Sequence, residues 1–392
     1  MASPEASHVK TLIVDELQDC FAGHRDREPI WRDFTLRTSI LSIQRAFFSA
    51  TLPPHLQPVF FRKASLDASL MVIRRSTDRP ELGYHVLTVN PSKSGVTIWE
   101  SLKRLVFHLK TLLHSDERIV LFFQDEKDAD LFATQTGCAK YHSKLPLVGK
   151  SKAYYFDLWA RGESAVMAAS TAFQQGVDYG WVAYVIYFKD AYGLINYDQG
   201  GGRSSRRGHP SYVIILRDEN RNPTCKWSQL GAVEDTHCRF AFLQLARNVK
   251  YCMRYMISST MDGKELAVSC KDVVGSNPCG ICNPESETSK YIRWAVHTPI
   301  PPISPVGVLP QQQVLSAHIE TNSDDEYGDI EFTPEMALVM DSVEVYQAAK
   351  VRLFCLITVQ DAELHLTRPS RFPKALPIPP HPICTRQSMK MQ

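Results

Sequence analysis

The sequence is poor in features that mark secreted, membrane and strongly charged proteins. It has 10 cysteines in 392 residues, too few for a disulfide scaffold, and no signal-like segment at its start, so we expect an intracellular, reducing compartment. No apolar run reaches the roughly 20 residues that cross a bilayer, and no membrane partner is predicted. The formal net charge is only +2. Any contact with nucleic acid must therefore come from local basic patches.

Short apolar runs are abundant by contrast. Apolar residues make up 44% of the chain, enough for two or three domains with buried cores. Continuous apolar runs that alternate with amphipathic segments indicate a parallel sheet covered on both faces, and hence an α/β fold. The predicted strands are "TLIVD" (11–15), "RAFFSAT" (45–51), "RIVLFF" (118–123), "SAVMAAS" (164–170), "VAYVIYF" (182–188) and "SYVIIL" (211–216).

The clearest predicted helix is "SLKRLVFHLKTLLHSD" (101–116). Its apolar residues recur at helical spacing on one face, so we expect this helix to pack on the sheet. The residues of that face are Leu102, Leu105, Val106, Leu109, Leu112 and Leu113.

Changes in composition divide the chain into four parts. A linker with Pro80 and Gly83 is predicted at 74–84, and the pattern becomes helical and cysteine-bearing near 226. After "NPCGICNPE" come a proline-rich stretch (298–310) and an acidic one (320–332), which predict a largely irregular linker and tail. The predicted domains are 1–75, 76–225, 226–285 and 286–392.

The stretch "LIVDE" (12–16) ends an apolar strand with two carboxylates. In open α/β sheets ligands bind at the carboxyl ends of strands. There Asp15 could hold hydrated Mg²⁺ while Glu16 orients an attacking water, as phosphoryl transfer requires. A solvated acidic turn is the alternative that this stretch alone leaves open.

Three further stretches follow in a fixed order. They are "FFSATLPP" (47–54), "VMAASTAFQQGVDYGWVAYVIYF" (166–188) and "INYDQGGGRSSRRGHPSYVIIL" (195–216). In order and separation they resemble motifs III, V and VI of superfamily 2 helicases, most closely the RecQ-like DNA helicases. The resemblance covers about residues 10–285 and implies two RecA-like lobes, the first partial and the second complete, with ATP between them and single-stranded nucleic acid across their upper face.

The resemblance also implies roles for individual residues. Asp15 and Glu16 resemble the Mg²⁺-binding and water-activating pair of motif II, and Ser49 and Thr51 resemble the hydroxyl pair that couples hydrolysis to lobe movement. Guanidinium groups stabilise charge that develops on a transferring phosphoryl group. Residues at the matching nucleotide-contacting positions are Arg203 and Arg206, which would reach the γ-phosphate, and Thr171, Gly176, Asp178 and Gln199.

The sequence also departs from this family. Gln18 and Tyr187 stand where RecQ-like chains usually carry histidine. No stretch matches the phosphate-binding pattern GxxxxGK[ST]; the nearest, "KLPLVGKS" (144–151), has lysine in place of the first glycine, so we interpret Lys150 as a surface residue. We therefore expect a carboxyl-side portion of a helicase, with ATP turnover by these residues alone weak or absent.

Four cysteines form a second constellation: Cys252, Cys270, Cys279 and Cys282. Four thiolates with a terminal C-x-x-C suit tetrahedral Zn²⁺, and the pattern resembles the zinc subdomain of RecQ-like proteins. The "MDG" at 261–263 resembles a divergent fungal branch of that family. The alternatives are buried free cysteines, or Cys238 as the first ligand. Because no open coordination position is evident, a structural zinc is predicted.

Taken together, the motifs favour an ATP-dependent 3′–5′ DNA helicase that acts on single-stranded or partly duplex DNA in the nucleus. The rival interpretation is a catalytically inactive remnant that binds nucleic acid or a protein partner. Basic residues that could contact phosphates, or could simply be solvated, are Arg203, Arg206, Arg207, Lys226 and the "KSK" at 150–152.

Overall fold

The structure is a computed structural model. It describes residues 11–15, 44–63, 66, 71–174, 177–221 and 236–301. Predictions for Glu16, Gln18, Gly176, Lys226 and the tail from residue 302 onward lie outside these ranges. Within them, no helix is long and apolar enough to cross a membrane.

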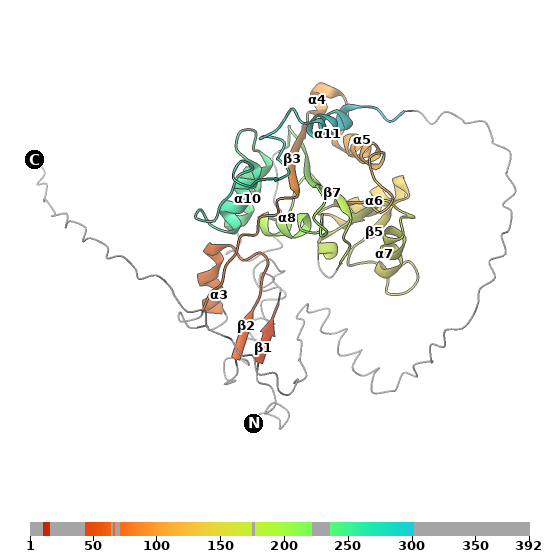
Figure 1. Ribbon diagram of the computed structural model, residues 1–392. Coiled ribbons are helices and arrows are strands. Elements are labelled where there is room, and N and C mark those ends of the chain that lie inside the picture. Colours follow the sequence, from red (N-terminus) through yellow and green to blue (C-terminus); the bar gives the residue numbers. More distant parts are fainter. Residues whose placement is uncertain are drawn as a thin grey trace, which may run out of the picture. The chain divides into compact units, whose positions relative to one another are not determined.

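A six-stranded parallel sheet forms the centre of the described chain, in the order β3-β8-β7-β4-β6-β5 (Figure 1). Every residue of the central strands β4 and β7 is buried, as expected for a sheet covered on both faces. The predicted α/β class is confirmed. The strands are β3 (Leu82–Val89), β4 (Arg118–Phe122), β5 (Ala139–Tyr141), β6 (Val166–Ala169), β7 (Val182–Phe188) and β8 (Ser211–Asp218).

Two of these strands, β3 and β5, lie where no strand is predicted. The predicted linker ends at Glu81, because Leu82 and Gly83 already belong to β3 and pair with Ser211 and Tyr212 of β8. Strand β3 mixes Tyr84 and His85 with its apolar residues, and β5 is only three residues long. Neither has the continuous apolar run that identifies the central strands.

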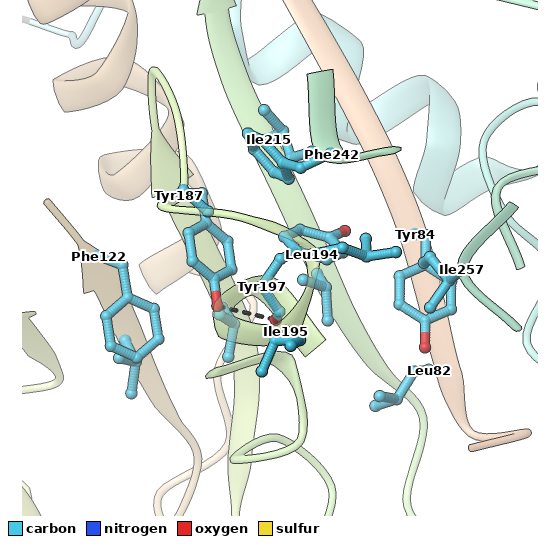
Figure 2. Packing of buried hydrophobic residues seen from close by; sticks show 14 of the residues in the cluster. Leu82, Tyr84, Phe122, Tyr187, Leu194, Ile195, Tyr197, Ile215, Phe242 and Ile257 are labelled. Carbon is cyan, nitrogen blue, oxygen red and sulfur yellow. Dashed lines mark hydrogen bonds between the residues drawn. The ribbon is translucent and has the colours of Figure 1, made fainter. Parts of the chain in front are cut away.

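Alternate side chains of the sheet pack into two separate layers. Leu121, Ile186 and Ile214 face one layer, together with helices α5 (Ile98–Lys110), α6 (Glu126–Thr136) and α11 (Glu287–His297). Phe122, Tyr187 and Ile215 face the other, shown in Figure 2 with Tyr197 and Phe242. The elements of this second layer are η4 (Thr171–Gln174), α7 (Lys152–Ala160), α8 (Leu194–Gly201), α9 (Thr236–Ala246) and α10 (Met253–Met261).

Helix α5 is shorter than predicted. It begins after Thr97, whose hydroxyl accepts a hydrogen bond from the Glu100 N–H at 3.1 Å, and it ends at Lys110. Leu102, Leu105, Val106 and Leu109 are buried as predicted, but Leu112 is 43% exposed. The prediction that the buried face continues is therefore wrong for Leu112, whereas Leu113 is half-buried against the same layer although it too lies beyond the helix end.

The segment before the sheet contains a small parallel pair, β1 (Thr11–Val14) and β2 (Gln44–Phe47). It continues into η3 (Pro54–Leu56) and α3 (Gln57–Lys63). Leu56 and Phe60 of these elements are buried in the same layer as α8, α9 and α10. Both predicted strands of the first lobe are present, although β2 ends at Phe47.

A helix also occupies residues for which the sequence predicts a linker. Helix α11 begins after Ser286, whose Oγ accepts from the Ser289 N–H at 3.1 Å. It packs on α5, where Tyr291 Oη donates to the carbonyl of His108 at 3.1 Å. A short helix, α4 (Pro91–Ser94), follows β3.

The packing of α5 can be tested by truncating a core leucine of the helix and, for comparison, a leucine that lies beyond the helix end. We expect Leu105→Ala to lower the free energy of unfolding by about 2–5 kcal/mol, because Leu105 is fully buried and its removal leaves a cavity. Leu112→Ala should change it by less than about 0.5 kcal/mol. Urea unfolding of both variants measures the difference; equal losses would contradict the position of the helix end.

Candidate functional site

The four predicted cysteines converge in the structure. Cys252 precedes α10, and Cys270, Cys279 and Cys282 lie in the segment between α10 and α11. Their Sγ atoms all lie within 4.8 Å of one another, and they are the one such group of potential metal ligands among the described residues. Cys238 is fully buried elsewhere, with its Sγ 3.7 Å from His55 Nε2. The geometry therefore favours Cys252 over Cys238 as the first ligand.

The spacing and chemistry of these thiols fit a metal of zinc's size. Zn–S bonds of about 2.3 Å in a tetrahedron place sulfur atoms about 3.8 Å apart, and Cys252 Sγ lies 3.6 Å from Cys270 Sγ. Backbone N–H groups also point at the sulfurs: Cys270 N donates to Cys252 Sγ and Cys279 N to Cys270 Sγ, both at 3.3 Å. Such donors stabilise thiolates, so the cluster could hold a metal ion.

The pKa shifts of the cysteines also indicate that the cluster could bind a metal ion. Hydrogen bonds from Cys252 and Cys270 lower the pKa of Cys279, while the bond with Cys252 raises the pKa of Cys270. A thiolate at Cys279 is thus stabilised by hydrogen bonds from neighbouring thiols. A divalent cation would supply the charge needed to deprotonate all four. With four sulfur ligands the site would be closed, which is typical of structural metal sites.

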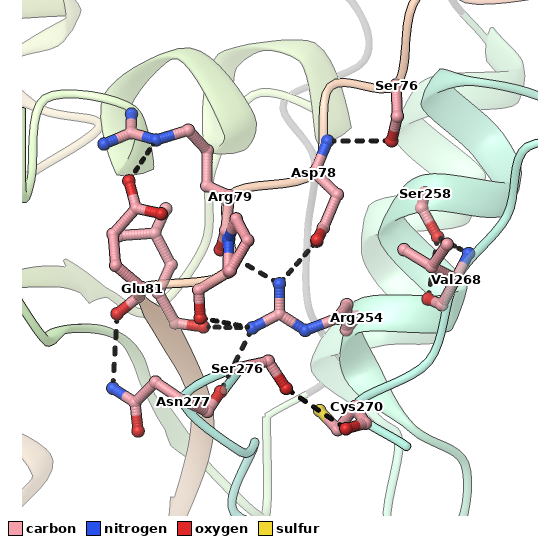
Figure 3. A network of polar contacts seen from close by, with 12 residues as sticks. Ser76, Asp78, Arg79, Glu81, Arg254, Ser258, Val268, Cys270, Ser276 and Asn277 are labelled. Atoms are coloured by element: carbon pink, nitrogen blue, oxygen red, sulfur yellow. Dashed lines mark hydrogen bonds and ion pairs between the residues drawn. The ribbon is translucent and has the colours of Figure 1, made fainter. Parts of the chain in front are cut away.

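A single buried arginine holds the segment around this cluster to the sheet (Figure 3). Arg254, on α10, is 1% exposed. Its guanidinium donates to the carbonyls of Arg79 (2.9 Å), Leu82 (2.7 Å) and Asn277 (3.0 Å), and it forms an ion pair with Asp78. The residues around the cysteines are therefore fastened both to the segment before β3 and to each other.

The edge of β3 receives further bonds from the same segment. Gly280 N–H donates to the Tyr84 carbonyl at 2.9 Å, and Asn277 N–H donates to the Pro80 carbonyl at 2.7 Å. A Cβ on Gly280 would lie 2.6 Å from His85 Nδ1, so only glycine permits this close approach. The segment that bears Cys279 therefore runs against the edge strand.

The predicted motif V and motif VI residues also meet. Arg203, just after α8, donates to the Val177 carbonyl at 2.7 Å and to the Gln174 carbonyl. The exposed Arg206 pairs with Asp178 at 2.5 Å. Both arginines thus lie against the segment that joins β6 to β7, and the Ser205 N–H bonds to the Val182 carbonyl at 3.2 Å, near the start of β7. Thr171 and Gln199 are half-buried on η4 and α8, two elements in contact.

Tyr187, at the position where histidine is expected, forms hydrogen bonds to α8. Its hydroxyl donates to the Tyr197 carbonyl of α8 at 2.9 Å (Figure 2). A Cβ on Gly200 would overlap this hydroxyl, so the larger side chain requires glycine at that position. Tyr187 therefore links the motif V strand to the motif VI helix.

The first-lobe candidates lie at the carboxyl ends of β1 and β2. These strands are parallel, with Val14 opposite Phe47, so Asp15 and Ser49 follow their strands on the same edge. Asp15 is exposed, and the Thr51 N–H donates to Ser49 Oγ at 3.1 Å.

Among the basic candidates for phosphate contacts, Lys150 and Arg207 are exposed. His142 is buried against Asp130, with 3.1 Å between Nε2 and Oδ1.

Asp198 is a notable charged residue that the sequence analysis does not single out. It is half-buried on α8, and this burial, together with the negative charges of Asp262 and Asp78, raises its pKa to about 7. Asp262 itself accepts hydrogen bonds from Ser76 Oγ (3.0 Å) and the Thr77 N–H (2.9 Å). Acidic groups from α8, α10 and the segment before β3 therefore influence one another.

Comparison with known proteins gives matches to helicases. No protein-family model matches the chain. It is 25% identical over 222 residues to a putative ATP-dependent DNA helicase Q1 of Caenorhabditis briggsae, covering 53% of this chain and 33% of that protein. It is 26% identical over 142 residues to the RecQ-like DNA helicase blm-1 of Caenorhabditis elegans, covering 34% of this chain and 14% of that protein. The chain thus spans a third or less of these relatives.

Solved structures also resemble parts of the fold. Dbp5 of S. cerevisiae bound to RNA and ADP BeF3 matches 54% of each chain at 14% identity and a TM-score of 0.43. Helicase Lhr of Mycobacterium smegmatis bound to ssDNA and AMP-PNP matches 54% of this chain and 29% of that one, at 18% identity and a TM-score of 0.40. In sequence, the chain is similar to RecQ-like DNA helicases.

Removing one cysteine tests the metal centre. We expect the wild-type protein to bind about one equivalent of zinc and Cys279→Ser to bind less than about half, because Cys279 is buried inside the cluster. Cys238→Ser, a buried cysteine outside the cluster, is the matched control and should retain zinc. Metal analysis of the purified proteins measures this; similar zinc in both variants would contradict the assignment.

The raised pKa of Asp198 predicts a pH-dependent effect of its replacement. An aspartate with a folded pKa near 7 costs stability as pH rises from its unfolded value, about 3.8, through 7. Asp198→Asn should therefore leave the free energy of unfolding unchanged near pH 3.8 and raise it by about 1–3 kcal/mol above pH 7. Urea unfolding across this range measures the gain; a gain that is the same at every pH would refute the assigned pKa.

Proposed function

We propose that this chain carries the hydrolysis-coupling part of a RecQ-like helicase motor that uses ATP with Mg²⁺ to move 3′–5′ along DNA. The observation that carries the proposal is the contact of Arg203 and Arg206 with Gln174, Val177 and Asp178. These are the motif VI and motif V positions, and they lie together although more than 20 residues separate them in sequence. The nuclear, DNA-bound setting is part of the same proposal.

The charge and geometry of the arginines suit a role toward phosphate. Arg206 is exposed and held by one exposed carboxylate, that of Asp178, so a phosphate group can compete for its donors. Arg203 is anchored through two backbone carbonyls, which fix the direction of its side chain. Preorganised guanidinium groups can raise the rate of phosphoryl transfer by about 10³–10⁵-fold.

The remaining residues have supporting roles in this proposal. Asp15 binds Mg²⁺, Glu16 activates the water, and Ser49 and Thr51 couple hydrolysis to movement between lobes. Thr171, Gly176, Asp178 and Gln199 contact nucleotide or transmit its state. Zn²⁺ on Cys252, Cys270, Cys279 and Cys282 has a structural role.

A second candidate function follows from the lack of a phosphate-binding pattern in these residues. No GxxxxGK[ST] occurs among the 392 residues, so nothing in them supplies the familiar cradle of backbone donors and lysine for the β- and γ-phosphates. On this candidate, the chain binds single-stranded or partly duplex DNA, or a partner, without turning over ATP.

DNA-stimulated ATP hydrolysis separates the two functions. For the first, we expect activity in the wild-type protein, and a loss of about 10²-fold or more in Glu16→Gln and Arg203→Lys, because each removes a group to which this proposal gives a role in the transition state. Arg161→Lys is the control, since Arg161 is 59% exposed and pairs only with surface carboxylates. Unwinding of 3′-tailed rather than 5′-tailed duplexes tests the direction.

Absence of hydrolysis in all proteins, with the fold and zinc intact, would reject the first function for this chain. The second would then require DNA binding that weakens as salt rises. Fluorescence anisotropy with a labelled single strand measures it, and no binding at low salt would leave a protein partner as the ligand class.

A further inference from the structure

Arg79 binds the loop that carries the two motif VI arginines. It lies just before β3, in the stretch predicted as a linker (74–84), and has no role predicted from the sequence. Its Nη2 donates to the carbonyls of Ser204 (3.1 Å) and Ser205 (2.9 Å), and its Nη1 donates to that of Gly202 (3.3 Å). The three carbonyls belong to the residues that flank Arg203 and precede Arg206. One guanidinium therefore binds three backbone carbonyls of residues 202–206, which we call the arginine loop.

The loop needs such a partner. Ser204 and Ser205 are 0% and 1% exposed, so their carbonyls require hydrogen bonds within the protein. Ser205 also has a φ of 49°, in the left-handed region that a non-glycine residue adopts at a cost of about 1 kcal/mol or more. Arg79 donates hydrogen bonds to both of these carbonyls, and one of them belongs to Ser205, where the backbone is strained.

Arg79 is itself held from two sides. Its Nε donates to Glu81 Oε1 at 2.5 Å, which orients the guanidinium. Its own carbonyl accepts from Arg254 Nη1 at 2.9 Å, and the neighbouring Asp78 pairs with the same guanidinium (Figure 3). Arg254 is two residues beyond Cys252 on α10. A series of hydrogen bonds therefore leads from α10, the helix that follows Cys252, through Arg79 to residues 202–205.

We infer that Arg79 is a positioning residue that holds the loop of Arg203 and Arg206 in place, and that Arg254 secures Arg79 from the cysteine-bearing subdomain. The consequence for catalysis rests on the proposed function, while the positioning itself does not. Lysine cannot replace Arg79 fully, because a single ammonium cannot match the planar fork that reaches three carbonyls and a carboxylate.

Hydrogen exchange on the full chain tests the positioning. We expect Arg79→Ala to speed exchange at the amides of residues 202–208 by about 10-fold or more, and Arg79→Lys to have a smaller effect, while amides of β4 and β7 are unchanged. Arg104→Ala is the matched control: Arg104 also pairs with a carboxylate and a carbonyl, Glu100 and His297, but on the other face of the sheet. It should leave residues 202–208 unaffected.

Unchanged exchange at 202–208 in Arg79→Ala, or an equal rise throughout the protein, would overturn the inference. If the wild-type protein hydrolyses ATP, Arg79→Lys should lower kcat by about 10-fold with KM for ATP within about twofold, since the arginines act on the transition state. A changed KM with unchanged kcat would also overturn it. If the wild-type protein hydrolyses no ATP, the proposed function fails while the exchange result still decides the positioning.

Discussion

The buried guanidinium of Arg254 is the interaction on which the arrangement of this protein depends. An arginine that is 1% exposed would be costly without partners, because the loss of hydration is not offset. Here the Asp78 carboxylate balances its charge, and the backbone carbonyls of Arg79, Leu82 and Asn277 accept hydrogen bonds from its guanidinium. The cysteine-bearing segment and the sheet can meet only in the one register that satisfies all of these groups.

Burial explains which strands are predictable. The residues of β4 and β7 are buried throughout, and β8 is buried in its centre, so each reads as an unbroken apolar run. Strand β3 lies at the edge of the sheet and contains Tyr84 and His85, and β5 has three residues. Periodicity alone does not distinguish such strands from loops. The end of α5 is similarly obscured, because Leu112 and Leu113 continue the helical spacing beyond Lys110.

The candidate site also contains residues that the sequence predicts and residues that it does not. The cysteine spacing predicts the four thiols that meet and leaves Cys238 as an alternative, which the structure places outside the cluster, buried near His55. Arg203 and Arg206 are visible as a motif, whereas the contacts of Arg79 are not, because they are made with backbone carbonyls that no residue type reveals. Arg254 does leave a trace: it lies on the buried stripe of α10 with Met253, Ile257 and Met261. A charge on an apolar stripe indicates a buried polar network.

The bonds along β3 bear on solubility as well as on stability. An edge strand offers unpaired N–H and C=O groups to any other extended chain, which is the usual beginning of sheet-to-sheet association. In this protein the segment of Asn277 and Gly280 lies on that edge and donates to the carbonyls of Pro80 and Tyr84. Cys279 lies within this segment, and Cys270 and Cys282 lie before and after it. On the proposal that these cysteines hold zinc, loss of the metal would free the segment and expose β3 to self-association while the rest of the sheet was still folded.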